Sequence, residues 1–150
     1  MSKKTIAFLF LLIVSPVLIY FLWPTDESRI KKLAGECIRA AEKEDLDTLM
    51  SKISFTYQDD YGLSYILLKK LIEDGFRRFS EIDAEHENLK VNVMDEKATA
   101  TFDIRVIASH GQERGYFMGD IKEPAHITLH LEKGPLGKWL IVKAEGYRGF

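Results

Sequence analysis

The sequence predicts an α+β domain carried on an N-terminal transmembrane helix. Three patterns indicate this: an uncharged apolar run at residues 5–23, apolar residues that recur every three or four positions up to about residue 80, and alternation with period two from Ile82 onward. Since the helical patterns all precede the strand patterns, helices and sheet should be segregated. We therefore expect three helices packed on a curved antiparallel sheet of four or more strands.

The apolar run at residues 5–23 has the length of a membrane span. As a helix that rises ~1.5 Å per residue it would reach about 28 Å, close to the thickness of the hydrocarbon core of a bilayer. Tyr20 and Trp23 are typical of the aromatic belt at a membrane interface, and Pro16 would kink the helix without preventing a span. A buried helix of a soluble domain would show a polar face, and this run shows none.

A cleaved signal peptide is the alternative that stays open. Lys3 and Lys4 supply the basic start of a signal peptide. However, residues 20–24 are bulky and contain no small-x-small cleavage site. The sequence therefore favours an uncleaved signal anchor.

The expected organisation is a single-pass membrane protein with one domain. Because the two lysines lie directly against the span, the positive-inside rule predicts a cytoplasmic tail at residues 1–4 and an anchor at residues 5–23. Residues 24–150 then form an extracytoplasmic domain, periplasmic in a bacterium, and are enough for one core but not for two. The formal net charge of −2 gives no broad basic surface, so nucleic acid is not an expected partner. The single cysteine, Cys37, cannot form an intramolecular disulfide and is expected to be buried on an apolar helix face.

Three helices are expected between the anchor and the sheet. They cover residues 26–43, residues 46–52 after the capping residue Asp45, and residues 64–80. The third helix has the strongest pattern, because charges of alternating sign at a spacing of four lie opposite an apolar stripe. That stripe consists of Leu68, Leu71, Ile72, Phe76 and Phe79. We expect Phe76 to share one core with Trp139 of the sheet.

A meander of four or more antiparallel strands is expected after the helices. Apolar and polar side chains alternate at residues 89–93, 98–108, 125–132 and 139–146. The residues before position 87 are out of phase with those that follow, which predicts a β-bulge near Glu87 and Asn88. The segment 109–122, which contains three glycines, is expected to be a loop or a hairpin extension.

This order of elements resembles the nuclear transport factor 2-like superfamily, whose fold is a cone-shaped α+β domain. The matching features are the opening amphipathic helix, the helix entry at 45–47, the Phe-rich third helix, the hairpin at 91–98 and the strand entry at 137–139. The resemblance covers about residues 26–146. It implies a curved sheet that wraps around the helices and leaves a pocket. The candidate pocket residues are Tyr57, Tyr61, Phe76, Phe102 and Trp139. Members include isomerases, dehydratases, polyketide cyclases and non-catalytic modules, so the fold alone does not name the function.

The nearest candidates for catalysis are Asp59, Asp60, Tyr57 and Tyr61. The resemblance implies that an isomerase of this kind needs a carboxylate base and a tyrosine that stabilises an oxyanion, both in an apolar pocket. Adjacent aspartates before Gly62 are also ordinary turn residues. Because the segment is polar and flexible, we expect it not to seal out water, and the two carboxylates to titrate near the ordinary value of ~3.9.

No metal or other cofactor is expected. His126 and His130 lie on one face of a strand, about 13 Å apart at ~3.3 Å per residue, and one ion cannot bind both. Two histidines on a solvated sheet face explain this spacing better.

The favoured function is a membrane-anchored binding or scaffold domain without catalysis. Besides the membrane, its partner would be a protein, a second copy of the chain or a small apolar ligand. The alternative is an isomerase or lyase that acts on a small apolar ligand in the cone. A deep cavity lined by Tyr57, Asp59 and Trp139 would favour catalysis, and a cone filled with side chains would favour a scaffold.

Overall fold

The computed structural model describes residues 3–147 and contains helices first and a sheet afterwards. The helices are α1 Lys3–Leu22, α2 Asp26–Glu42, α3 Leu46–Met50 and α4 Tyr65–Arg78. The strands are β1 Ser80–Met94, β2 Lys97–His110, β3 Glu113–Met118, β4 Ala125–Lys133 and β5 Trp139–Glu145, with a 3-10 turn η1 Pro135–Gly137 before the last one. The predicted α+β class is confirmed, and segment 109–122 contains a hairpin strand.

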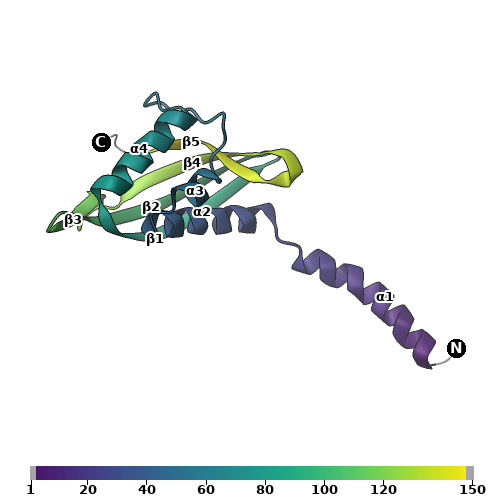
Figure 1. Ribbon diagram of the computed structural model, residues 1–150. Coiled ribbons are helices and arrows are strands. Elements are labelled where there is room, and N and C mark those ends of the chain that lie inside the picture. The colour runs from purple at the N-terminus through teal and green to yellow at the C-terminus, as the bar shows by residue number, and fades with distance from the viewer. Residues whose placement is uncertain (1–2, 148–150) are drawn as a thin grey trace.

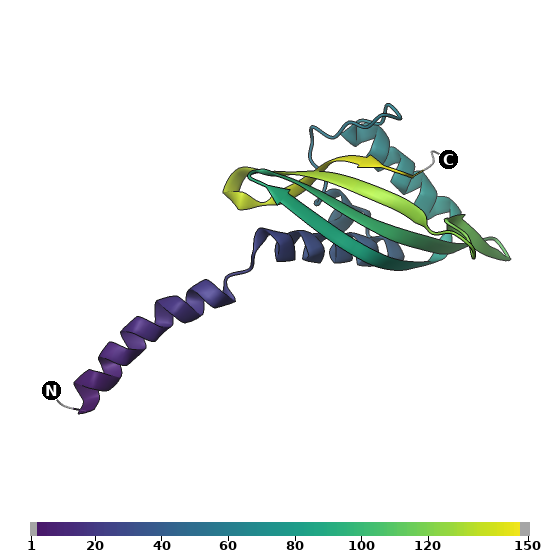
Figure 2. The same ribbon diagram turned by 180° about the vertical axis from the view of Figure 1, so that it is seen from behind.

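α1 stands apart from the domain, and none of its described residues is buried (Figures 1 and 2). Within residues 3–147 it is the one helix that is long and apolar enough to cross a membrane, judged by length and composition. A helix that is apolar all round is unfavourable in water and suits a lipid surrounding. Pro16 lies inside this helix without ending it.

The three helices of the domain begin at capping side chains. Thr25, Asp45 and Ser64 each accept a hydrogen bond from the backbone N–H three residues further on, over 3.2, 3.0 and 3.5 Å. The chain between the last two caps crosses to the sheet, because the N–H of Ser54 donates to the carbonyl of Ile141 at 2.9 Å. This loop, residues 51–64, therefore lies against the outer edge of β5.

The sheet is antiparallel in the order β1-β2-β4-β5, and β3 pairs with the far part of β2. β2 is long enough to pair first with β4, from Lys97 to Ile104, and then with β3, from Val106 to His110. The predicted bulge is confirmed, since the register of β1 shifts between Glu87 and Lys90. Bulges increase the local twist of a strand, and the sheet bends around the helices in both views (Figures 1 and 2).

The core lies between α2 and one face of the sheet. Ile30 of α2, together with Ala100 of β2 and Leu131 of β4, is almost wholly excluded from solvent. The side chains of β2 that alternate inward are those predicted from the sequence, because each strand residue points opposite to its neighbours. α4 differs from α2: none of its residues is fully buried. The space between α4 and the sheet is therefore incompletely filled.

Candidate functional site

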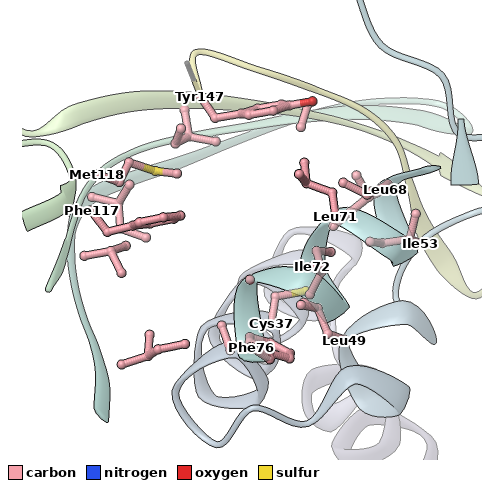
Figure 3. A pocket seen from close by; sticks show the side chains of 18 of the residues that line it. Cys37, Leu49, Ile53, Leu68, Leu71, Ile72, Phe76, Phe117, Met118 and Tyr147 are labelled. Carbon is pink, nitrogen blue, oxygen red and sulfur yellow. The ribbon is translucent and has the colours of Figure 1, made fainter. Parts of the chain in front are cut away.

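A cavity of about 330 Å³ lies between α4 and the sheet (Figure 3). Its walls are apolar side chains that come from the helices and from the strands. They include Leu68, Leu71, Ile72 and Phe76 of α4, Phe102, Ile104, Ile127 and Leu129 of the sheet, and Phe117 and Met118 of β3. Among residues 3–147, no Asp, Glu, Lys, Arg or His lines this cavity. The cone is open, and its interior is uncharged.

The apolar stripe of α4 forms one wall of the cavity and is only half-buried for that reason. Figure 3 shows Leu71, Ile72 and Phe76 projecting from this helix toward the open space. Gly75 also lines the cavity, and a Cβ at that position would meet no heavy atom within 4 Å. The stripe predicted from the sequence is therefore correct as a pattern: Leu68 and Ile72 pack against the edge of the core, and the stripe as a whole lines the cavity.

Tyr57, Tyr147 and Cys37 are the residues of the cavity wall whose side chains carry a hydroxyl or a thiol. Burial raises the pKa of the Cys37 thiol to about 12, so it stays protonated at neutral pH. The Tyr57 hydroxyl donates to Oδ2 of Asp59 at 2.8 Å, and the Tyr147 hydroxyl donates to the same oxygen. Both phenol protons are thus directed at one carboxylate.

Asp59 is buried, with 6% of its surface exposed, and the expectation that this segment would leave it in contact with water is wrong. Its other oxygen, Oδ1, accepts the N–H groups of Tyr61 at 2.9 Å and Leu63 at 3.0 Å. Burial alone would raise the pKa of Asp59, but its hydrogen bonds, led by the one from Tyr147, outweigh burial and hold the pKa below its ordinary value. The carboxylate is therefore ionised at neutral pH and fully engaged as an acceptor.

The two phenols are held in the neutral form. Burial and the hydrogen bond to Asp59 raise the pKa of Tyr57 and of Tyr147 well above the ordinary value. A tyrosinate at either position would place a second negative charge beside the carboxylate. The cluster of Tyr57, Asp59 and Tyr147 thus carries one negative charge, which lies behind the hydroxyls and outside the cavity wall.

Tyr147 reaches the cluster because the chain turns sharply at Gly146. This glycine has φ of +90°, and a Cβ there would collide with the carbonyl oxygen of His126. The close approach of the two backbones turns Tyr147 back across the end of the cavity (Figure 3). No local pattern in the sequence indicates this contact, because Tyr147 lies 88 residues from Asp59.

Of the pocket residues suggested by the sequence, Tyr57, Phe76 and Phe102 line the cavity. Tyr61 does not: its side chain is 51% exposed, and its ring lies against that of Tyr147 with centroids 4.8 Å apart. Trp139 is buried elsewhere, where its indole N–H donates to Asp26 at 3.0 Å. The expected common core of Phe76 and Trp139 is therefore wrong, because Phe76 is not part of the buried cluster that holds Trp139.

The catalytic candidates separate in the same way. Tyr57 and Asp59 meet, whereas Asp60 points outward and forms an ion pair with Lys143 at 2.8 Å. The two histidines of β4 have separate acidic partners. Nδ1 of His126 lies 2.8 Å from Oδ1 of Asp103, and Nε2 of His130 lies 3.2 Å from Oε1 of Glu145. Within residues 3–147, no group of three His, Cys, Asp or Glu side chains could hold a metal ion.

Comparison with known proteins rests on structure, because no family model and no curated protein matches the sequence. A nuclear transport factor 2-like superfamily protein of Salmonella enterica serovar Typhimurium superposes with a TM-score of 0.64 at 15% identity, over 80% of this chain and 89% of that one. A protein of Novosphingobium aromaticivorans, proposed to be a scytalone dehydratase, superposes with a TM-score of 0.65 at 12% identity, over 81% of this chain and 87% of that one. A protein of Bdellovibrio bacteriovorus superposes with a TM-score of 0.65 at 9% identity. The match covers 80% of this chain but only 40% of that longer protein. At these identities the likeness concerns the fold.

Proposed function

Since this chain has the nuclear transport factor 2-like fold, we propose that it is a membrane-anchored domain that binds a small, uncharged, largely apolar ligand in its cone without transforming it. The observation that carries the proposal is the cavity of about 330 Å³ with no charged group in its wall. That volume lies at the lower end of the ~300–1,000 Å³ common for small-molecule sites. A filled cone would have favoured a pure scaffold.

The wall sets the chemistry of the ligand. Apolar surface that leaves water for this cavity gains about 25 cal/mol per Å². A charged ligand would lose its hydration without gaining a partner, because the charge of Asp59 is already surrounded by hydrogen-bond donors. Because the lining side chains are almost all apolar, the proposed ligand carries at most a hydroxyl or N–H group at one end of an apolar body.

The arrangement of Asp59 supports binding over catalysis. A general base must reach the proton that it removes and works best when its pKa lies near the operating pH. Asp59 lies behind Tyr57 and Tyr147, accepts four hydrogen bonds and has a lowered pKa. The hydrogen bonds of Asp59 have a structural role, because they connect residues 57–63 to Tyr147, just after β5, at the wall of the cavity.

An isomerase or lyase is the alternative, and the pair of tyrosines at the cavity wall favours it. Tyr57 and Tyr147 are neutral donors, as an oxyanion site requires. The protein proposed to be a scytalone dehydratase shares the fold. For such a reaction one phenol proton would have to leave Asp59 and turn to the substrate. The alternative would be established if the wild-type chain converts a small apolar substrate to a product and the Tyr57→Phe variant does not.

We also propose that α1 anchors the domain as a single-pass helix with a cytoplasmic N-terminus and the domain on the other side. Support comes from the exposed apolar surface of α1 and from Lys3 and Lys4 at its start. A domain held beside a bilayer meets apolar molecules that are scarce in water, which agrees with the cavity chemistry.

The test compares two glycine substitutions in the full chain, reconstituted in lipid nanodiscs. Gly75→Leu places a side chain into the cavity, whereas Gly35→Leu makes the same change on α2, outside the cavity wall. We expect the uncharged fluorophore N-phenyl-1-naphthylamine to bind the wild-type and Gly35→Leu chains beyond the signal of empty nanodiscs. Gly75→Leu should bind at least about tenfold more weakly. Equal binding by the two variants, or none by the wild type, would contradict the proposal.

A further inference from the structure

The turn between β4 and β5 displays an apolar side chain in an unusual way. Leu136 is fully exposed and has φ of +62°, a backbone conformation that favours Gly or Asn. Pro135 beside it is also exposed. Turns are normally polar, because their side chains face water. A leucine held outward in a left-handed conformation therefore suggests a contact outside the domain.

This turn is fixed beside the point where the chain leaves the anchor. Asp26, the first residue of α2, accepts hydrogen bonds from Lys133 and from Trp139, each at 3.0 Å. These two residues flank the turn. Both views place it at the end of the domain from which α1 departs (Figures 1 and 2). Leu22 and Asp26 are four residues apart, so even a fully extended connector reaches only about 14 Å.

The neighbouring turn carries a second exposed apolar side chain. Met94, at the end of β1, is largely exposed, and the β1–β2 turn is joined to β4 by a hydrogen bond from the N–H of Lys133 to the carbonyl of Glu96 at 2.8 Å. The basic residues at this end, Lys97, Lys133 and Lys138, lie among at least as many acidic ones, which are Asp26, Asp95, Glu96 and Glu132. Lys133 pairs with Asp26 at 3.0 Å, and Lys97 lies 3.9 Å from Glu132. A contact made here depends on apolar surface and not on net charge.

We propose that Leu136, with Met94 on the adjacent turn, inserts into the interface of the bilayer that holds α1 and so fixes the orientation of the domain on the membrane. The inference rests on the anchor of the proposed function and is independent of the ligand. The short connector keeps this turn beside the bilayer, so the effective concentration of the turn at the membrane is high. A few apolar side chains are then enough to hold the turn in the interface. Because this end carries no excess of positive charge, the contact does not depend on anionic lipid.

The experiment uses the full chain with Cys37→Ala, reconstituted in phosphatidylcholine nanodiscs that contain nitroxide-labelled lipid. A single cysteine carries the fluorophore NBD, at Leu136→Cys in one sample and at Gln112→Cys in the control. Gln112 lies in the β2–β3 turn, at the opposite end of the sheet, and is also exposed. We expect quenching by the lipid nitroxide to be at least about threefold stronger at position 136 and unchanged when salt is raised to about 0.5 M.

A second variant tests the effect on orientation. With NBD at Met94→Cys, the change Leu136→Asn should reduce quenching at position 94, and Asn accepts the left-handed backbone without strain. Equal quenching at positions 136 and 112 would overturn the proposal, and quenching that vanishes at high salt would overturn apolar insertion. Carbonate washing of liposomes separates the two claims. A chain that is washed off contradicts the anchor and the contact together, whereas a retained chain with equal quenching contradicts the contact alone.

Discussion

The hydroxyl of Tyr147 donates a hydrogen bond to the carboxylate of Asp59, although 88 residues separate them in the chain. This bond joins the loop before α4 to the end of β5, the last strand. It also completes the set of four donors around a buried charge. The closure of one end of the cavity and the lowered pKa of Asp59 therefore depend on the same contact.

Replacing Tyr147 by Phe should weaken the fold by about 1.5–3 kcal/mol, the usual effect of removing a hydrogen bond to a charged group. The pKa of Asp59 should rise toward its ordinary value, because its strongest donor is lost. Urea unfolding and an NMR titration of the carboxylate would measure both effects. Tyr61→Phe is the control, because the ring of Tyr61 is half-exposed and packs against the ring of Tyr147. This substitution should change stability by less than about 0.5 kcal/mol.

Asp59 should make stability depend on pH in the acid range. Its pKa is lowered in the folded state, so below about pH 4 the unfolded chain binds more protons than the folded chain. The stabilisation is fully present above the pKa that Asp59 has in the unfolded chain. It is lost as the pH falls through the lower pKa that Asp59 has in the folded chain. Asp59→Asn should be less stable than wild type at pH 7, and the difference should shrink below about pH 4. Urea midpoints at several pH values would test this, and a difference that grows toward low pH would contradict it.

Phe76→Ala should cost less than truncation of a buried core residue. Phe76 faces an existing cavity, so its removal exposes little new apolar surface, and we expect a loss below about 2 kcal/mol. Leu131→Ala, at a residue with 1% of its surface exposed, should cost about 2–5 kcal/mol. Both values come from urea unfolding. A larger loss for Phe76→Ala than for Leu131→Ala would show that α4 carries the core.

The anchor predicts that the mature protein keeps residues 1–23. After expression in a bacterium, the intact mass should include this segment, and the chain should stay in the membrane fraction during carbonate washing. A variant that lacks residues 1–23 should be recovered in the soluble fraction. Recovery of a wild-type form that starts near Asp26 would show cleavage instead.

The sequence predicted those features that depend on neighbouring residues. The inward side chains of β2 follow from alternation, and the bulge follows from a break in phase near Asn88, which adopts φ of +58°. Whether the stripe of α4 meets other side chains or an empty space depends on distant strands, and the two outcomes look the same in sequence. The partnership of Asp59 with Tyr147 depends likewise on a turn at Gly146 and on chain closure over the whole sheet.

The two outer strands of the β1-β2-β4-β5 sheet are blocked in different ways, and this bears on the membrane anchorage proposed above. β1 breaks its register twice and carries charged residues such as Glu85 and Lys90, while β5 is covered by residues 52–58 through main-chain hydrogen bonds. Tethered chains diffuse in two dimensions and collide often with similar orientation, so an open strand edge would invite edge-to-edge growth of sheets. The blocking of β1 and β5 therefore disfavours edge-to-edge growth of sheets among copies that a membrane would hold at high density.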